Sequence, residues 1–163
     1  MLTRMTKTTA VSPPVSEILE QFFDGFEADA SDARRLRNSA VRLDLEQYLE
    51  REGERILTDG QRAILNTERD FDREGAFVRT MHAPDLFYAL EHYLDPAHAF
   101  LGIEQRRVQV EAIAALITCL LGGRWVWGEA ISECCLIDVE LAIRRARTDL
   151  SHARAFERSL RRP

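Results

Sequence analysis

The sequence predicts an all-α, single-domain bundle of about six helices, built around a buried central helix at residues 104–121 and closed by a long C-terminal helix. Residues 108–121 read VQVEAIAALITCLL, and their later half is apolar on nearly every face, so other elements must cover this helix. The flanking segments repeat apolar residues every three or four positions, and no alternating stretch is long enough for a sheet. The apolar run is also shorter than the roughly 20 residues of a membrane-spanning helix.

Length and composition fit one ordinary globular domain. The chain has 163 residues, of which 45% are hydrophobic and 30% charged, far from the composition of disordered proteins. We expect residues 1–11 to form a disordered arm and residues 12–163 a single helical domain. The basic residues of the arm precede no apolar run, so the arm does not read as a secretory signal.

The cysteines agree with a cytoplasmic protein. There are three of them, two adjacent, and all fall in apolar helical segments: Cys119, Cys134 and Cys135. No CxxC spacing accompanies them, so we interpret them as small buried hydrophobes and keep a redox role for the adjacent pair as the alternative.

The first two helices have clear start and stop signals. Ser12 and Pro13 open the first helix, since serine can cap a helix and proline fits its first turn. Ser31 caps the second helix, which runs to about Glu52 and is stopped by Gly53. The first helix has an apolar stripe of Val15, Ile18, Leu19, Phe22, Phe23 and Phe26, and the second a broad apolar face of Leu36, Ala40, Val41, Leu43, Leu45, Tyr48 and Leu49.

A capping-box pattern at Thr58 and Gln61 starts a third helix that runs through about Phe71, with Ile64, Leu65 and Phe71 directed inward. Residues 72–83 show no helical period and are predicted to be a loop or a short extended stretch. Pro84 then opens a fourth helix with the stripe Leu86, Phe87, Leu90, Tyr93 and Leu94, and Asp95-Pro96 ends it.

The last helix is the longest. Nothing interrupts it from Glu129 to about Leu160, and it carries a seam of Leu136, Val139, Ile143, Ala146, Leu150 and Ala153. Its first half is expected to lie against the central helix, with Ile131, Cys135 and Ile137 widening the contact. Its second half, from Arg144 onward, is expected to project from the body, either as a fraying bundle helix or as a surface for self-association.

Charge is distributed unevenly along the chain. The net charge is −5, but residues 144–163 carry +5, which leaves −10 on the rest. Lys7 is the one lysine among 22 basic residues. A basic C-terminal helix beside an acidic body permits contact with acidic protein surfaces or with phosphates.

No motif predicts a catalytic residue, a cofactor or a metal site. The glycines form neither a dinucleotide-binding nor a Walker pattern, and no G-x-S-x-G elbow is present. His82, His92 and His98 lie near Asp85, Glu91 and Asp95, but their spacing matches no metal motif, so we interpret them as solvated or capping residues. An enzyme or metal site in a groove near these histidines remains the second alternative for function.

Residues 16–52, SEILEQFFDGFEADASDARRLRNSAVRLDLEQYLERE, resemble the start of the SAM-like core-binding module of tyrosine recombinases. In that module a hydrophobic helix is followed by a polar turn and a second helix, whose last part Arg42, Leu45, Tyr48 and Leu49 match here. The resemblance implies a helical DNA-contacting element, with Arg34, Arg35, Arg37 and Arg42 near phosphates. The chain departs from the family in its length, its acidic body and the absence of a recognisable catalytic set. As a whole it resembles helical proteins of actinobacteria, which implies no activity.

The sequence therefore favours a cytoplasmic, non-enzymatic interaction or assembly protein, with no membrane contact and with itself or another protein as partner. Nucleic-acid association through the arginine-rich C-terminal helix is the first alternative, although the acidic body disfavours it. Tryptophan and arginine dominate protein interfaces. The candidate interface residues are Trp125, Trp127, Arg144, Arg147, Leu150 and Arg154.

Overall fold

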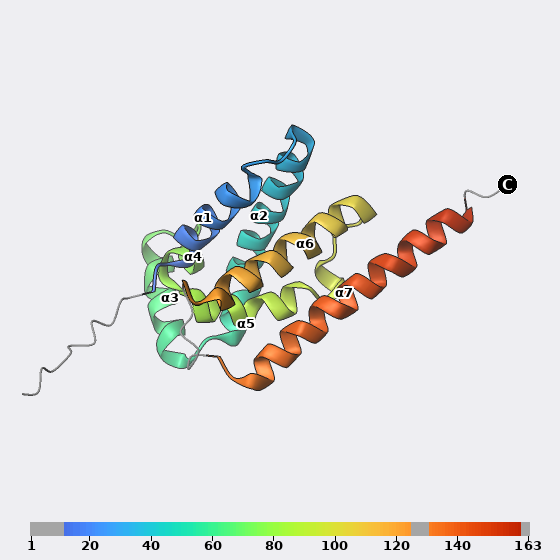
Figure 1. Ribbon diagram of the computed structural model, residues 1–163. Helices are drawn as coiled ribbons and strands as arrows, with labels where there is room; N and C mark the ends of the chain where they lie inside the picture. The colour runs from blue at the N-terminus through green and yellow to red at the C-terminus, as the bar shows by residue number, and fades with distance from the viewer. Residues whose placement is uncertain (1–11, 125–130, 161–163) are drawn as a thin grey trace, which may run out of the picture.

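The computed structural model describes residues 12–124 and 131–160, which form an all-α bundle of seven α-helices with no strand in those ranges (Figure 1). The predicted arm at residues 1–11 and the tryptophans at 125 and 127 lie outside the described residues. The helices are α1 (Val15–Glu27), α2 (Asp32–Glu52), α3 (Asp59–Phe71), α4 (Ala76–Thr80), α5 (Ala83–Tyr93), α6 (Ile103–Cys119) and α7 (Glu133–Leu160).

Two helices begin at predicted capping residues, Ser31 and Thr58, and a third, α5, is capped by Asp85, which the sequence did not predict as a cap. The first helix starts later than predicted, at Val15, with Pro14 and not Ser12 at its N-cap position. Ser31 accepts a hydrogen bond from the Arg34 backbone N–H at the start of α2. At the start of α3, the Thr58 hydroxyl accepts from the backbone N–H of Gln61, whose side-chain oxygen accepts from the Thr58 N–H at 3.0 Å. Asp85 accepts from the His82 N–H at 3.0 Å and so caps α5. Local sequence therefore sets these boundaries.

The central helix is confirmed. α6 packs against α1, α2, α5 and α7, and the side chains along its length have no exposed surface at Val108, Ala112, Ile113, Leu116 and Leu120. α6 ends in a π-helical turn, Leu120–Arg124, close to the predicted end at Leu121. No helix in the described ranges is both long and apolar enough to cross a membrane.

The prediction for residues 72–83 is wrong, because this segment contains the short helix α4. Gly75 precedes it with φ of 71°, a left-handed conformation that glycine adopts without strain. Phe77 is fully buried and its ring packs over Gly53, where a Cβ atom would lie 2.5 Å from a ring carbon. Because α4 has a single turn, its apolar residues show no period that a sequence could reveal.

Two predicted apolar faces are narrower than expected. On α2, Val41, Leu45, Tyr48 and Leu49 are buried, and on α3 Leu65 is buried, as predicted. Both helices turn one side to solvent. The predicted inward residues on that side are exposed, at 74% for Leu36, 57% for Leu43, 57% for Ile64 and 85% for Phe71.

A buried polar pair holds the connection between α5 and α6. Arg106 donates to the Leu94 carbonyl at 2.8 Å and to the side-chain oxygen of Gln109 at 2.7 Å. Gln109 donates to the His98 carbonyl at 3.0 Å and accepts from the Phe100 N–H at 3.4 Å. Burial lowers the pKa of the Arg106 guanidinium. Two side chains of α6 therefore satisfy the backbone of the loop that precedes it.

Asn38 is a buried residue whose side-chain polar atoms are not satisfied within the described ranges. It has no exposed surface, and neither atom of its amide has a hydrogen-bond partner among the described residues. It lies on α2, which packs against α6. A buried amide without partners is unfavourable for folding.

Candidate interaction surface

The body-facing side of α7 is the predicted seam. Val139, Ala146 and Leu150 are buried, and Leu136 and Ile143 pack against the core while keeping part of their surface exposed. This side contacts α5 and α6. The seam therefore packs α7 against the body of the same chain, and it is not left open for a helix of another chain.

The helix leaves the body later than predicted. Leu150, a candidate interface residue, is only 9% exposed because it packs inside the chain. Arg154 lies 3.8 Å from Glu104 at the start of α6, so the body still contacts α7 there. The part that projects is residues 155–160, called the overhang below, at the end of the long helix in Figure 1.

The candidate arginines of α7 have different environments. Arg144 is paired with Glu140, one turn earlier, at 2.6 Å, and Arg154 with Glu104. Arg147 is exposed and makes no ion pair within the described ranges. Two of the three are therefore already close to a carboxylate of the same chain.

Three of the four arginines that the recombinase resemblance placed near phosphates also lie close to a carboxylate of the same chain. Arg34 pairs with Glu111 of α6 at 2.8 Å, and Arg42 with Glu46 at 3.0 Å. Arg35 lies 3.7 Å from Asp32, and Arg37 is exposed. Arg34 is thus one end of a network of ion pairs that links α2, α6 and α7. The network consists of Arg34, Glu111, Arg107, Glu104 and Arg154, in that order.

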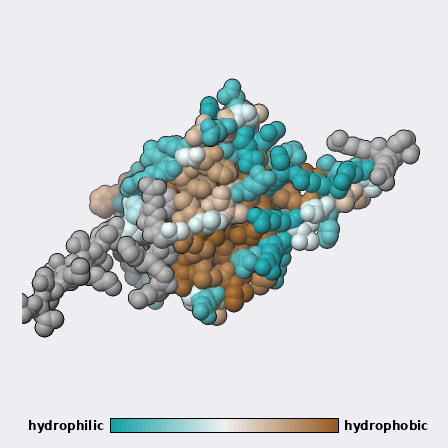
Figure 2. Space-filling view, in the orientation of Figure 1, coloured by the Kyte–Doolittle hydropathy of each residue, from teal (hydrophilic) through white to brown (hydrophobic). Residues whose placement is uncertain are grey.

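Large apolar side chains remain exposed on α7. Ile137 is 57% exposed, so it does not widen the contact as predicted, and Leu141, at the edge of the hollow between α5 and α7, is 40% exposed. On the overhang, Phe156 is 65% and Leu160 69% exposed. Figure 2 shows apolar surface gathered where the C-terminal half of α6 and the first half of α7 lie. Four of the ten large apolar residues that the described ranges expose are on this one helix.

A hollow of about 270 Å³ lies between the end of α5 and α7 and is called the α5–α7 hollow below. Its apolar lining comes from Leu94, Pro96, Leu141, Ala142 and Ala146, and its charged and polar lining from Glu91, His92, Asp95, Asp138, Arg145 and Asp149. Its volume is just below the roughly 300–1,000 Å³ of small-molecule sites. The sequence left a groove near His92 open as an alternative site, but it did not predict these walls, because residues far apart in the chain form them.

The histidines do not form one cluster. His82 lies at the start of α5 with its Nδ1 atom 3.2 Å from the Pro13 carbonyl oxygen, whereas His92 and His98 lie at the other end. His92 and His98 line a second hollow of about 350 Å³, where the His98 ring packs against Tyr48 at 4.7 Å. Burial, and after it Glu52, raises the pKa of Tyr48 to about 12. The described ranges contain no group of three metal-ligating side chains.

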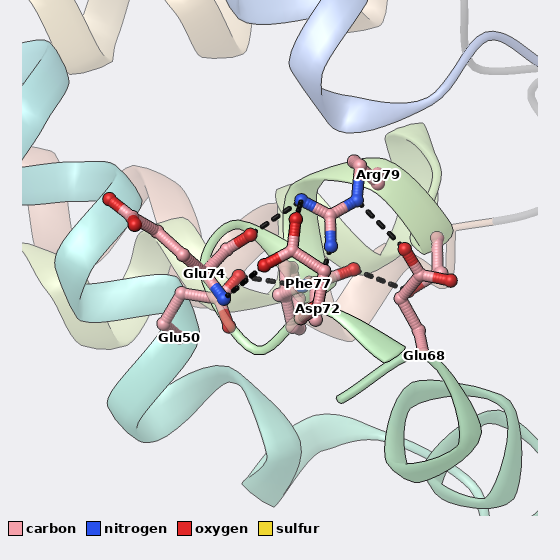
Figure 3. Close-up of polar contacts among 8 residues, drawn as sticks. Glu50, Glu68, Asp72, Glu74, Phe77 and Arg79 are labelled. Carbon is pink, nitrogen blue, oxygen red and sulfur yellow. Dashed lines mark hydrogen bonds and ion pairs between the residues drawn. The ribbon is translucent and has the colours of Figure 1, made fainter. Parts of the chain in front are cut away.

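A third hollow, of about 520 Å³, lies between α2 and α4 beside the charged cluster of Figure 3. The Glu50 carboxylate of α2 accepts a hydrogen bond from the Phe77 N–H at 2.6 Å and so caps α4, which has no cap of its own. Burial raises the pKa of Glu50, and the bond from Phe77 opposes that rise.

Arg79 fixes the other side of α4. Its guanidinium donates to the Glu68 carboxylate of α3 at 2.8 Å and to the backbone carbonyls of Asp72 and Glu74 (Figure 3). The partners of this arginine lie on α3 or in the segment that joins α3 to α4. We therefore assign this cluster to holding α4 on the bundle.

Comparison with known proteins adds no family to these observations: no family model, no curated protein and no solved structure matches this chain.

Proposed function

We propose that this protein is a helical assembly module that associates with a second copy of itself through α7. The observation that supports the proposal is the set of four large apolar side chains that α7 leaves in solvent. A helix already docked by one apolar side has no need of them for its own packing. The four side chains form two pairs, Ile137 with Leu141 and Phe156 with Leu160, about 22 Å apart along the helix. Exposed apolar side chains that lie together mark interaction sites more often than scattered single residues do.

The charges of α7 agree with a contact between proteins. Arg144 and Arg154 have carboxylates of the same chain beside them, which reduces the positive charge available to a phosphate backbone. Proteins that bind nucleic acid without sequence preference depend on several such free cations. Association through apolar surface needs none of them.

Static light scattering on the full chain, over a range of concentrations and at low and high salt, tests the proposal. The expected result is a dimer whose mass changes little with salt, since apolar burial is not screened. Replacing the four α7 residues by serine should give a folded monomer. The matched control replaces four equally exposed apolar residues of α2 and α3 by serine and should stay dimeric. A parent chain that is monomeric throughout, or a control that dissociates equally, contradicts the proposal. The α7 set is Ile137, Leu141, Phe156 and Leu160, and the control set is Leu36, Leu43, Ile64 and Phe71.

Nucleic-acid association is the second candidate, and three α7 arginines that make no ion pair in the described ranges favour it: Arg145, Arg147 and Arg158. In the same experiment, added duplex DNA would then raise the mass at low salt, and the complex would dissociate steeply as salt increases. Changing these arginines to glutamine would flatten that salt dependence.

A further inference from the structure

One face of α7 connects its overhang with the α5–α7 hollow. Asp138, Ala142, Arg145 and Asp149 line the hollow, and the exposed Phe156 and Leu160 follow them along the helix. The successive spacings of these six residues are four, three, four, seven and four, so all lie within one side of an α-helix. The overhang and the α5–α7 hollow are therefore two parts of a single surface.

We infer that the overhang of a second copy fills the α5–α7 hollow, with the two α7 helices antiparallel around a two-fold axis near Asp149. This inference rests on the proposed self-association and specifies its geometry. The positions of the residues along α7 support this geometry. Ala142 and Phe156 are each seven residues from Asp149, which is two helical turns or about 10 Å along the axis. A two-fold axis at Asp149 therefore sets Phe156 of each copy opposite Ala142 of the other.

The hollow matches the overhang in size, and its apolar part suits the Phe156 ring. Ala142 is small and partly exposed, and beside it the hollow offers Leu94, Leu141 and Ala146 as apolar contacts. A volume of about 270 Å³ suits one or two large side chains better than a cofactor. The same operation seats both overhangs at once, so the assembly closes as a dimer and leaves no free overhang to continue a filament.

The charges near the axis also fit a second copy. Two Asp149 carboxylates would approach each other there, which alone is unfavourable. Arg145 lies one turn earlier on the same face and makes no ion pair in the described part of the chain. In the antiparallel arrangement, Arg145 of one copy lies opposite Ala153 of the other, one helical turn or about 6 Å along the axis from that copy's Asp149. The long arginine side chain can span this distance to the carboxylate, and symmetry makes the pair twice.

An exchange of side-chain volume tests the arrangement on the full chain. Ala142→Phe fills the hollow from within, and Phe156→Ala removes the group that enters it, so each change should weaken dimerisation at least tenfold. The double variant moves the ring to the other side of the same contact and should restore most of the affinity. This restoration is the signature of a direct contact between the two positions. Leu36→Ala, at an exposed apolar residue of α2, serves as the control and should leave the dimer unchanged.

Analytical ultracentrifugation gives the dissociation constants, and far-UV circular dichroism shows whether each variant is folded. If Ala142→Phe alone fails to fold, two other measurements still test the axis. One is the dimerisation of Phe156→Ala. The other is disulfide crosslinking between two copies of Asp149→Cys, in a chain whose three native cysteines are replaced by serine. A dimeric parent in which both single variants stay dimeric, or in which the double variant is no tighter than the singles, overturns this geometry and leaves self-association intact. A monomeric parent overturns both.

Discussion

Replacing Asn38 by leucine should stabilise the fold. The side chain has no exposed surface and its amide has no partner among the described residues. A buried polar group without a partner costs about 1–3 kcal/mol. Leucine branches at the same carbon with two terminal atoms, so it fits the site with a repacking cost below about 1.5 kcal/mol, and it gains a few tenths of a kcal/mol in helix propensity. The expected net gain is about 1–2 kcal/mol.

Urea unfolding monitored by circular dichroism measures this gain. The midpoint should rise with an unchanged slope, and the melting temperature should rise by about 2–8 °C. Asn66→Leu, at an exposed position of α3, separates helix propensity from relief of the buried amide and should gain only tenths of a kcal/mol. Asn38→Asp buries a charge of the same shape and should lose more than about 2 kcal/mol. A loss of about 1 kcal/mol or more in Asn38→Leu would refute the reasoning, because it would mean that the amide is satisfied in solution, for example by a buried water.

Three further outcomes follow from the packing and the caps. Leu116→Ala, at a fully buried position of α6, should cost about 2–5 kcal/mol in urea unfolding, and a cost under about 0.5 kcal/mol would contradict the central position of that helix. Gly53→Ala should destabilise the protein by about 1–3 kcal/mol, because its Cβ would meet the Phe77 ring at 2.5 Å, and unchanged thermal stability would contradict that close approach. Glu50→Ala should cost about 1–2 kcal/mol by removing the acceptor of the Phe77 N–H, whereas Glu50→Gln keeps an acceptor. Because burial raises the pKa of Glu50, the folded state favours the protonated carboxyl, so the stability that this group contributes is present at low pH and is lost as pH rises through the raised pKa. The parent should therefore lose stability relative to Glu50→Gln between acid and neutral pH. A stability difference that does not change with pH would contradict this prediction.

The sequence predicted the parts of the fold that depend on neighbours along the chain. The capping box at Thr58 and the cap at Ser31 act within one turn, so a single sequence displays them. The buried face of α6 and the stripe of α5 follow from helical periodicity, which is also local.

The failures all involve contacts across the chain. α4 depends on Glu50, which lies on another helix and is separated from Phe77 by 27 residues. Leu43 and Phe71 fit an inward pattern, but which sides of a helix are covered depends on the position of its neighbours. The α5–α7 hollow forms only where α5 and α7 pack together. In the sequence its lining residues lie in separate segments, and nothing in either segment indicates that they meet.

The arrangement of Arg106 and Gln109 has a consequence for how freely this protein can change in sequence. What they bind in the α5–α6 connection is its backbone: the carbonyls of Leu94 and His98 and the N–H of Phe100. Backbone groups are the same whatever side chain they carry, so the exposed positions of that loop should tolerate many substitutions without changing its path. The constraint falls instead on two residues of the following helix, and a survey of random variants should find the loop permissive and positions 106 and 109 intolerant.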